Sequence, residues 1–229
     1  MSNPSTVTLS LVAAVSNGIA LSQAVAAAGA LTLNGSLASG GAANLVTARR
    51  VLVTSASASD AGLVFTVTGT SRYGFAQTST ATLATVSGTT SGYTALDFLT
   101  VTSIAAPSAT AGNITAGTNS IGSTDWLIDN FLAPDWSLSV LCIGVAGTTY
   151  TLETTLDDPC YMPGGWNFSI APGSNSPPVA TPNSVINAVS GTNQAQLGPG
   201  NMCYAHRLTI VSGTGSVTMQ SIQAGIGSP

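Results

Sequence analysis

Short runs of alternating apolar and polar residues recur along this chain, and they restrict its fold more than any other feature. Residues 63–70 place apolar side chains between threonines, and residues 93–104 and 148–156 repeat the alternation. A period of two is typical of strands with one buried face. Val, Ile, Thr and Phe also pack well on a pleated surface. The pattern therefore predicts an all-β fold, an antiparallel β-sandwich or a jelly-roll-like arrangement.

Gly, Ser, Asn and Pro divide the chain into segments. The expected strands cover residues 50–55, 63–70, 78–86, 93–104, 126–131, 136–144, 148–156, 166–170, 206–211 and 215–223. Residues 57–62 read as a hairpin turn, and residues 212–215 read as the turn of a terminal hairpin.

Residues 106–120 are rich in Ala, Gly, Ser, Thr and Asn, and they form either one short strand or a linker between two halves. We therefore expect two β-modules, at residues 42–118 and 119–229. Residues 1–41 are expected to form an N-terminal arm. This arm is extended or, over residues 18–31, helical, because alanine favours helix.

Charged residues are scarce, at 5% of the 229 residues, and no lysine is present. An ordinary soluble domain has about 25% and relies on interspersed charge for solubility. The composition therefore indicates a surface that neighbours occupy, or a protein that works outside the cell. It disfavours an enzyme, because acid–base chemistry needs titratable side chains. Four arginines are also too few for the phosphate contacts of nucleic-acid binding.

The apolar stretch over residues 9–31 does not predict a membrane span, because polar residues such as Ser16, Asn17 and Gln23 interrupt it. No basic residue precedes Arg49, so we expect no signal peptide. The sequence thus predicts no membrane partner.

Residues capable of chemistry give no recognisable site. His206 is the one histidine, and no G-x-S-x-G motif is present, so we expect no catalytic residue. Cys203-x-x-His206 with Cys142 and Cys160 forms a Cys₃His set that zinc accepts. Structural zinc sites usually take ligands in close pairs, however, and Cys142 and Cys160 are far apart in sequence. We expect buried or partly buried free thiols in a reducing compartment, with no metal and no cofactor.

The few charges gather at the ends of predicted strands. Arg49 and Arg50 open one strand, Arg207 opens another, and Asp157 and Asp158 end a third. Paired acids at that place favour a turn over a calcium site, which needs six or more oxygens. Arginine suits bidentate pairing with carboxylates, so these positions predict contacts between subunits.

Three tryptophans, Trp126, Trp136 and Trp166, are expected to anchor the core or a subunit interface. A carbohydrate-stacking platform is the alternative. In that case the tryptophans, or the proline-rich loop at residues 172–182, would contact a receptor.

Several segments together resemble structural proteins of tailed-bacteriophage virions. They are residues 18–35, 47–55, 65–70, 97–104, 153–159 and 213–225. The resemblance covers most of the chain, carries no catalytic motif and implies a β-rich particle component. We expect a non-enzymatic capsid decoration (cement) protein that bridges capsid subunits. A tail or head–tail connector component, or a host-surface glycan-binding module, is the alternative.

The resemblance also implies where the protein would act and what it would bind. The expected partners are the major capsid protein and further copies of this chain, in a homo-oligomer for which a trimer is one option. The expected location is the capsid surface of the virion, after synthesis in the host cytoplasm. The N-terminal arm would add a strand to a neighbouring sheet edge.

Overall fold

The computed structural model describes residues 4–129, 137–156, 180–197 and 203–224. Its elements are β-strands, apart from one short 3-10 turn, η1 (Ala58–Asp60), which confirms the predicted all-β fold. The strands are β1 (Ser5–Leu11), β2 (Ala20–Gln23), β3 (Gly29–Ala30), β4 (Ala38–Ser39), β5 (Ala42–Ser55), β6 (Val64–Thr70), β7 (Ala76–Thr82), β8 (Ala84–Val86), β9 (Thr89–Ala106), β10 (Ile114–Thr118), β11 (Gly122–Ser123), β12 (Leu127–Ile128), β13 (Ser137–Gly144), β14 (Thr149–Thr155), β15 (Thr181–Pro182), β16 (Thr192–Leu197), β17 (Ala205–Ser212) and β18 (Gly215–Ala224). Within these ranges, no helix has the length and apolar character that crossing a membrane requires.

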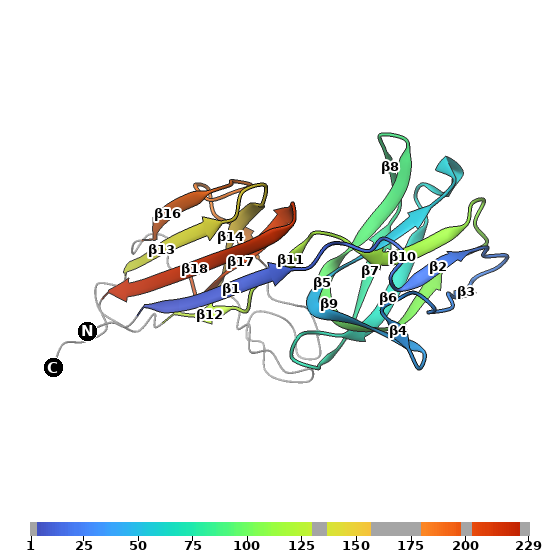
Figure 1. The fold of residues 1–229 in the computed structure, drawn as a ribbon, viewed down its shortest axis with the longest axis horizontal. Coiled ribbons are helices and arrows are strands. Elements are labelled where there is room, and N and C mark those ends of the chain that lie inside the picture. Colours follow the sequence, from blue (N-terminus) through green and yellow to red (C-terminus); the bar gives the residue numbers. More distant parts are fainter. Residues whose placement is uncertain (1–3, 130–136, 157–179, 198–202, 225–229) are drawn as a thin grey trace. The chain divides into compact units, whose positions relative to one another are not determined.

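The chain forms two compact modules (Figure 1). The terminal module contains residues 1–11 and 123–229, and the inserted module contains residues 12–122. This division differs from the expected one, because residues 1–41 are shared between the modules. The chain therefore enters the terminal module twice, once at each end of the inserted module.

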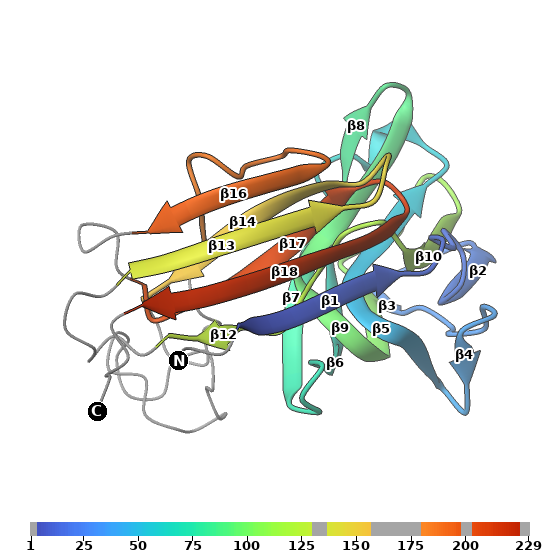
Figure 2. The ribbon, with the colours of Figure 1, turned by 60° about the vertical axis from the view of Figure 1, so that its left-hand side comes forward.

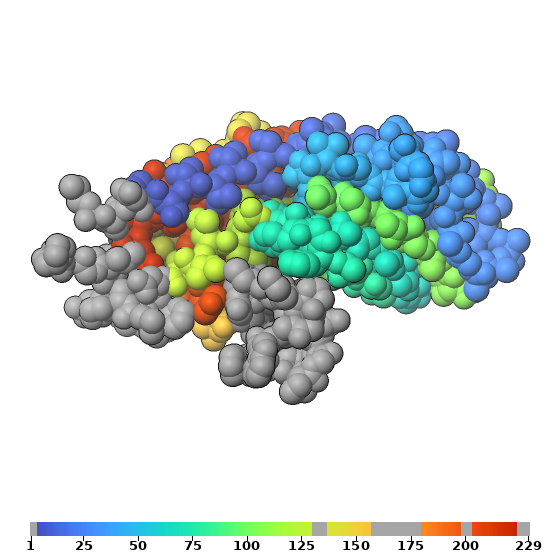
Figure 3. All heavy atoms as spheres, turned by 90° about the horizontal axis from the view of Figure 1, so that it is seen from below, coloured from blue at the N-terminus to red at the C-terminus, as the bar shows by residue number. Residues whose placement is uncertain are grey.

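Strand β1 makes this arrangement necessary. It pairs antiparallel with β18 along its whole length, from Ser5 opposite Ser221 to Leu11 opposite Gly215. Leu9 and Leu11 point into the core, while Thr8 and Ser10 are exposed. Figure 3 shows the dark blue atoms of this strand at the surface of the module. The structure does not confirm an N-terminal arm over residues 1–41: β1 pairs within its own chain, and residues 12–41 belong to the inserted module.

The terminal module is a sandwich of two sheets. The four-stranded sheet has the order β1-β18-β13-β16, which Figure 2 shows face on, and the five-stranded sheet has the order β11-β17-β14-β15, with β12 also on β17. Alternate residues of both sheets meet in one core. Its fully buried members include Leu138, Tyr150, Leu152, Ile210 and Met219.

The predicted terminal hairpin is wrong, because β17 and β18 lie in different sheets. Leu208 and Ile210 face Val217 and Met219 across the core. Two alternating segments joined by a glycine-rich link occur both in a hairpin and in a connection between two sheets. The sequence pattern therefore does not distinguish these two structures. The link is tight: a Cβ at Gly213, where φ is +92°, would lie 2.0 Å from the carbonyl oxygen of Gly147.

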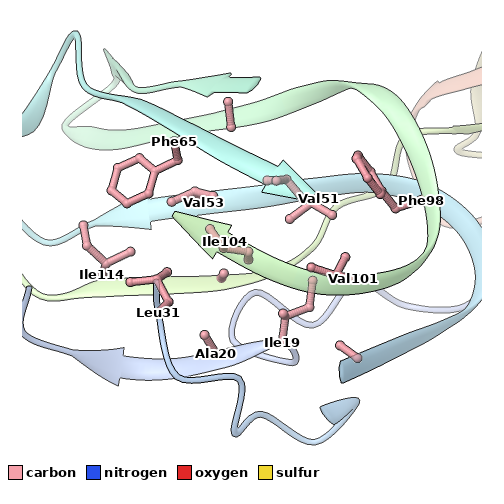
Figure 4. Close-up of a cluster of buried hydrophobic side chains, with 14 of the residues drawn as sticks. Ile19, Ala20, Leu31, Val51, Val53, Phe65, Phe98, Val101, Ile104 and Ile114 are labelled. Atoms are coloured by element: carbon pink, nitrogen blue, oxygen red, sulfur yellow. The ribbon is translucent and has the colours of Figure 1, made fainter. Parts of the chain in front are cut away.

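The inserted module contains one nine-stranded sheet, with the main order β2-β10-β5-β9-β6-β7. The long strands β5 and β9 pair with each other through two register shifts, and such irregularities bend a sheet. In Figure 4, β9 turns back on itself beside Phe98, so the sheet curves around its own core. Phe65, Phe98, Ile104 and Ile114 are fully buried there.

Three expectations for the inserted module are resolved by this sheet. Residues 57–62 are not a hairpin turn, because β9 lies between β5 and β6. Residues 106–120 contain a strand, β10, which pairs with both β2 and β5. The helical alternative for residues 18–31 is wrong, since β2 and β3 occupy that stretch.

Asp60 holds the turn η1 to the loop before β10. Its Oδ1 accepts from the Ala111 amide at 2.7 Å, and its Oδ2 accepts from the Gly112 amide at 3.0 Å and from the Ser55 hydroxyl. Burial on its own raises the pKa of this carboxyl. The hydrogen bonds from Ser55, Ala111 and Gly112 outweigh it, and the pKa lies below its ordinary value.

Replacing this carboxylate should loosen the loop. In Asp60→Asn, one acceptor oxygen becomes a donor that faces an N–H group, so we expect a loss of about 1–3 kcal/mol. Hydrogen exchange should show faster exchange of the Ala111 and Gly112 amides, with Ser59→Ala as the control. Because the pKa is lowered in the folded state, the stabilisation is present at neutral pH and is lost below about pH 4. Unchanged protection of both amides would contradict this role.

Candidate functional site

The exterior of the described residues carries almost no charge. Among the charged residues in the described ranges, Asp125 alone is largely exposed. Arg49, Asp60 and Asp129 are buried. The remaining ones are partly buried, and they are Arg50, Arg72, Asp97, Glu153 and Arg207.

The partly buried charges pair within the chain. Arg50 and Arg72 lie 3.8 and 3.9 Å from the two oxygens of Asp97. Arg207 Nε donates to Glu153 Oε2 at 2.7 Å. Arg50 and Arg207 were expected to contact a neighbouring subunit, but each pairs with an acid of its own module. Asp157 and Asp158 lie outside the described residues.

Arg49 does not open a strand, because β5 begins seven residues earlier and Arg49 is fully buried in it. Its Nη1 donates to the carbonyl oxygens of Val12 at 2.9 Å and Asn119 at 3.4 Å. Burial lowers the pKa of this guanidinium. Arg49 thus holds the two ends of the inserted module together, where the sequence suggested an intermolecular contact.

Hydroxyl and amide groups replace charge on the outer face of the four-stranded sheet. Its strands bring Thr8, Thr218, Ile143 and Thr192 into one row, and the hydroxyls of Thr8 and Thr218 share a hydrogen bond of 3.0 Å. We call this surface the hydroxyl face; its residues are Thr6, Thr8, Ser10, Ser139, Leu141, Ile143, Thr192, Gln194, Gln196, Ser216, Thr218, Gln220 and Ile222.

The same sheet ends in two edge strands, β1 and β16, within the part of the chain that the structure describes. An edge strand presents backbone N–H and C=O groups on one side, and these can pair with another chain. Charged residues usually protect such edges, yet neither β1 nor β16 contains one.

A second feature lies inside the terminal module, where three side chains converge. Asp129 Oδ2 lies 3.0 Å from His206 Nδ1 and 3.2 Å from Cys203 Sγ. All three residues are at least 95% buried. We call this group the Asp–Cys–His cluster.

Pairing between β12 and β17 assembles the cluster. Leu127 lies opposite His206 and Ile128 opposite Ala205, and the Asp129 amide donates to the Tyr204 carbonyl at 2.9 Å. This register places Asp129 beside Tyr204, just before β17, and so next to Cys203 and His206.

The Cys₃His set considered from the sequence is only partly brought together. Cys203 and His206 meet, but Cys142 lies on β13 in the core, where burial raises its pKa to about 12. Cys160 lies outside the described residues. Asp129 is the third member of the cluster. It lies 74 residues from Cys203 in sequence, and no motif connects the two residues.

The cluster is poorly suited to nucleophilic catalysis. A cysteine nucleophile must reach the thiolate form, whereas burial, and then the neighbouring Asp129 carboxylate, raise the pKa of Cys203. The carboxylate also lies within hydrogen-bonding distance of both the thiol and the imidazole, where a catalytic pair would have the imidazole on the thiol. The arrangement presents sulfur, nitrogen and oxygen donors to one point.

Trp126 is partly buried, with the Arg207 guanidinium 4.4 Å from its ring centroid. This stacking supports the expected anchoring role over a carbohydrate platform for Trp126. Trp136, Trp166 and residues 172–179 of the proline-rich loop lie outside the described residues, while Thr181 and Pro182 form β15 on β14.

Glu153 links the stacked arginine to the sheet, since its Oε2 also accepts from the Thr209 hydroxyl at 2.8 Å. Glu153→Gln should therefore lower the free energy of unfolding of the terminal module by about 1–2 kcal/mol. Urea unfolding followed by Trp fluorescence measures this, with Gln194→Ala on the hydroxyl face as the control. Equal stabilities of the two variants would refute the structural role of the pair.

Comparison of the chain with protein-family models, curated proteins and solved structures finds no match.

Proposed function

We propose that this chain is a non-enzymatic structural component of a bacteriophage particle, a decoration protein that bridges capsid subunits. Its partners would be the major capsid protein and other copies of itself, on the capsid surface. The assignment to a bacteriophage particle rests on the resemblance of the sequence to virion structural proteins.

The observation that carries the proposal is the nearly charge-free exterior of the part of the chain that the structure describes. Desolvating an unpaired charge is expensive, and charged residues are depleted at the centre of protein interfaces. A surface of hydroxyl, amide and small apolar groups can be covered by a neighbour at little desolvation cost. Burial then contributes about 25 cal/mol per Å² of apolar area.

The hydroxyl face and its two edges fit this use. All residues of this sheet surface are uncharged. The face can therefore pack against an uncharged surface of a neighbouring subunit. Strands β1 and β16 can extend pairing to a neighbour by strand addition. Two separate modules, each with its own core, would let one chain contact two capsid subunits.

Copy number in purified particles tests the proposal against the connector and tail alternatives. Quantitative mass spectrometry should find this chain in amounts of the same order as the major capsid protein. A number far below that would overturn decoration and favour a connector or tail component. Absence from the particle would overturn the virion role altogether.

Attachment that depends on uncharged contacts should resist salt. Raising NaCl from about 0.15 M to about 1 M screens exposed ion pairs, so particles sedimented at high salt should keep this chain. Release at high salt would contradict the proposed interface.

A charge on the hydroxyl face should weaken attachment. We expect Thr218→Lys to lower the amount of chain retained on particles, because the ammonium must be desolvated on contact. Ser59→Lys is the matched control, since it places the same charge on an exposed turn of the inserted module. Equal retention of both variants would exclude the hydroxyl face as the contact surface.

A further inference from the structure

We propose that Asp129, Cys203 and His206 bind one divalent transition-metal ion, with Zn²⁺ as the best fit, through Oδ2, Sγ and Nδ1. This metal site lies inside the terminal module and goes beyond the proposed structural role. It also departs from the expectation, drawn from the sequence, that the chain binds no metal.

The distances suit an ion of this size. All three donor atoms lie within 4.8 Å of one another, and two of the separations are 3.0 and 3.2 Å. Tetrahedral bonds of about 2.0 Å to N or O and 2.3 Å to S place donors roughly 3.3–3.5 Å apart. Small side-chain shifts therefore bring the donors around one ion, with a fourth position left for water.

The charges balance when the ion is bound. The carboxylate and the thiolate each carry one negative charge, and the imidazole is neutral, so the three ligands neutralise the +2 charge of the ion. A buried ion needs such compensation. Binding converts the Cys203 thiol into a thiolate, and the displaced proton leaves to solvent. The buried site then carries no net charge.

The imidazole is directed to the cluster. Nδ1 makes its contact with Asp129, while the buried Nε2 has no hydrogen-bond partner among the described residues. Here the contact that the described residues supply to the ring is the one into the donor set.

The donor types select the class of metal. Thiolate and imidazole favour zinc and similar borderline ions, whereas calcium and magnesium require oxygen ligands. Because Asp129 follows β12 and Cys203 precedes β17, a bound ion would clip the β12 segment to the start of β17. The inferred role is therefore structural.

Cobalt serves as the spectroscopic probe. The full-length chain, stripped with EDTA, is titrated with Co²⁺ under anaerobic conditions. We expect one equivalent to produce a thiolate-to-cobalt charge-transfer band and intense d–d bands, and Zn²⁺ to displace them. Cys203→Ser should abolish the charge-transfer band. Asp129→Asn should weaken binding by more than about 100-fold, since even the loss of a group that only orients a metal ligand costs about 10–100-fold.

Cys142→Ala is the matched control, because it removes a buried thiol of the same module that lies outside the cluster. It should keep the complete cobalt spectrum. Wild-type chain without a charge-transfer band would overturn the proposal, and this result does not depend on any variant folding. A band that survives in Cys203→Ser but disappears in Cys142→Ala would equally overturn the assignment.

Discussion

Antiparallel pairing between the first and last described strands is the interaction on which the rest of the structure depends. Strand β1 supplies Leu9 and Leu11 to the core of the terminal module, and its pairing with β18 brings the two ends of the described chain together. Everything between β1 and β11 must then form a module of its own. The bent nine-stranded sheet with its separate core meets that requirement.

The treatment of charge follows a single principle in both modules. Asp60 is buried with three hydrogen-bond donors, and Glu153 and Arg207 satisfy each other beside Trp126. In these cases hydrogen bonds compensate a charged group that lies inside the fold. The exterior is left to threonine, serine and glutamine, a distribution that suits contact with neighbours.

Much of the fold could be predicted from alternation, because period two reports which face of a strand is buried. The segment around Phe65 and the segment around Phe98 were recognisable as β6 and β9 in this way. Strand order was not, since β9 enters between β5 and β6 through pairing that local sequence does not encode. The same limit explains the wrong terminal hairpin.

The candidate site was only half visible in the sequence. Cys203 and His206 are close along the chain, and their spacing is that of a pair of metal ligands. Asp129 joins them through the register of β12 on β17, a two-residue strand with no distinctive pattern. For Arg49 the prediction was wrong: the sequence suggested a strand start that contacts a neighbouring subunit, whereas the guanidinium is buried and bonded to backbone carbonyls.

The nested topology has a consequence for the order of folding. All strands of the inserted module are synthesised before β18, so that module can close while the chain is still growing. Strand β1 must wait for a partner that lies at the far end of the sequence, since Ser5 pairs with Ser221. Such distant contacts form slowly. Until they form, strand β1 lacks its partner, and Leu9 and Leu11 lack the sheet that buries them.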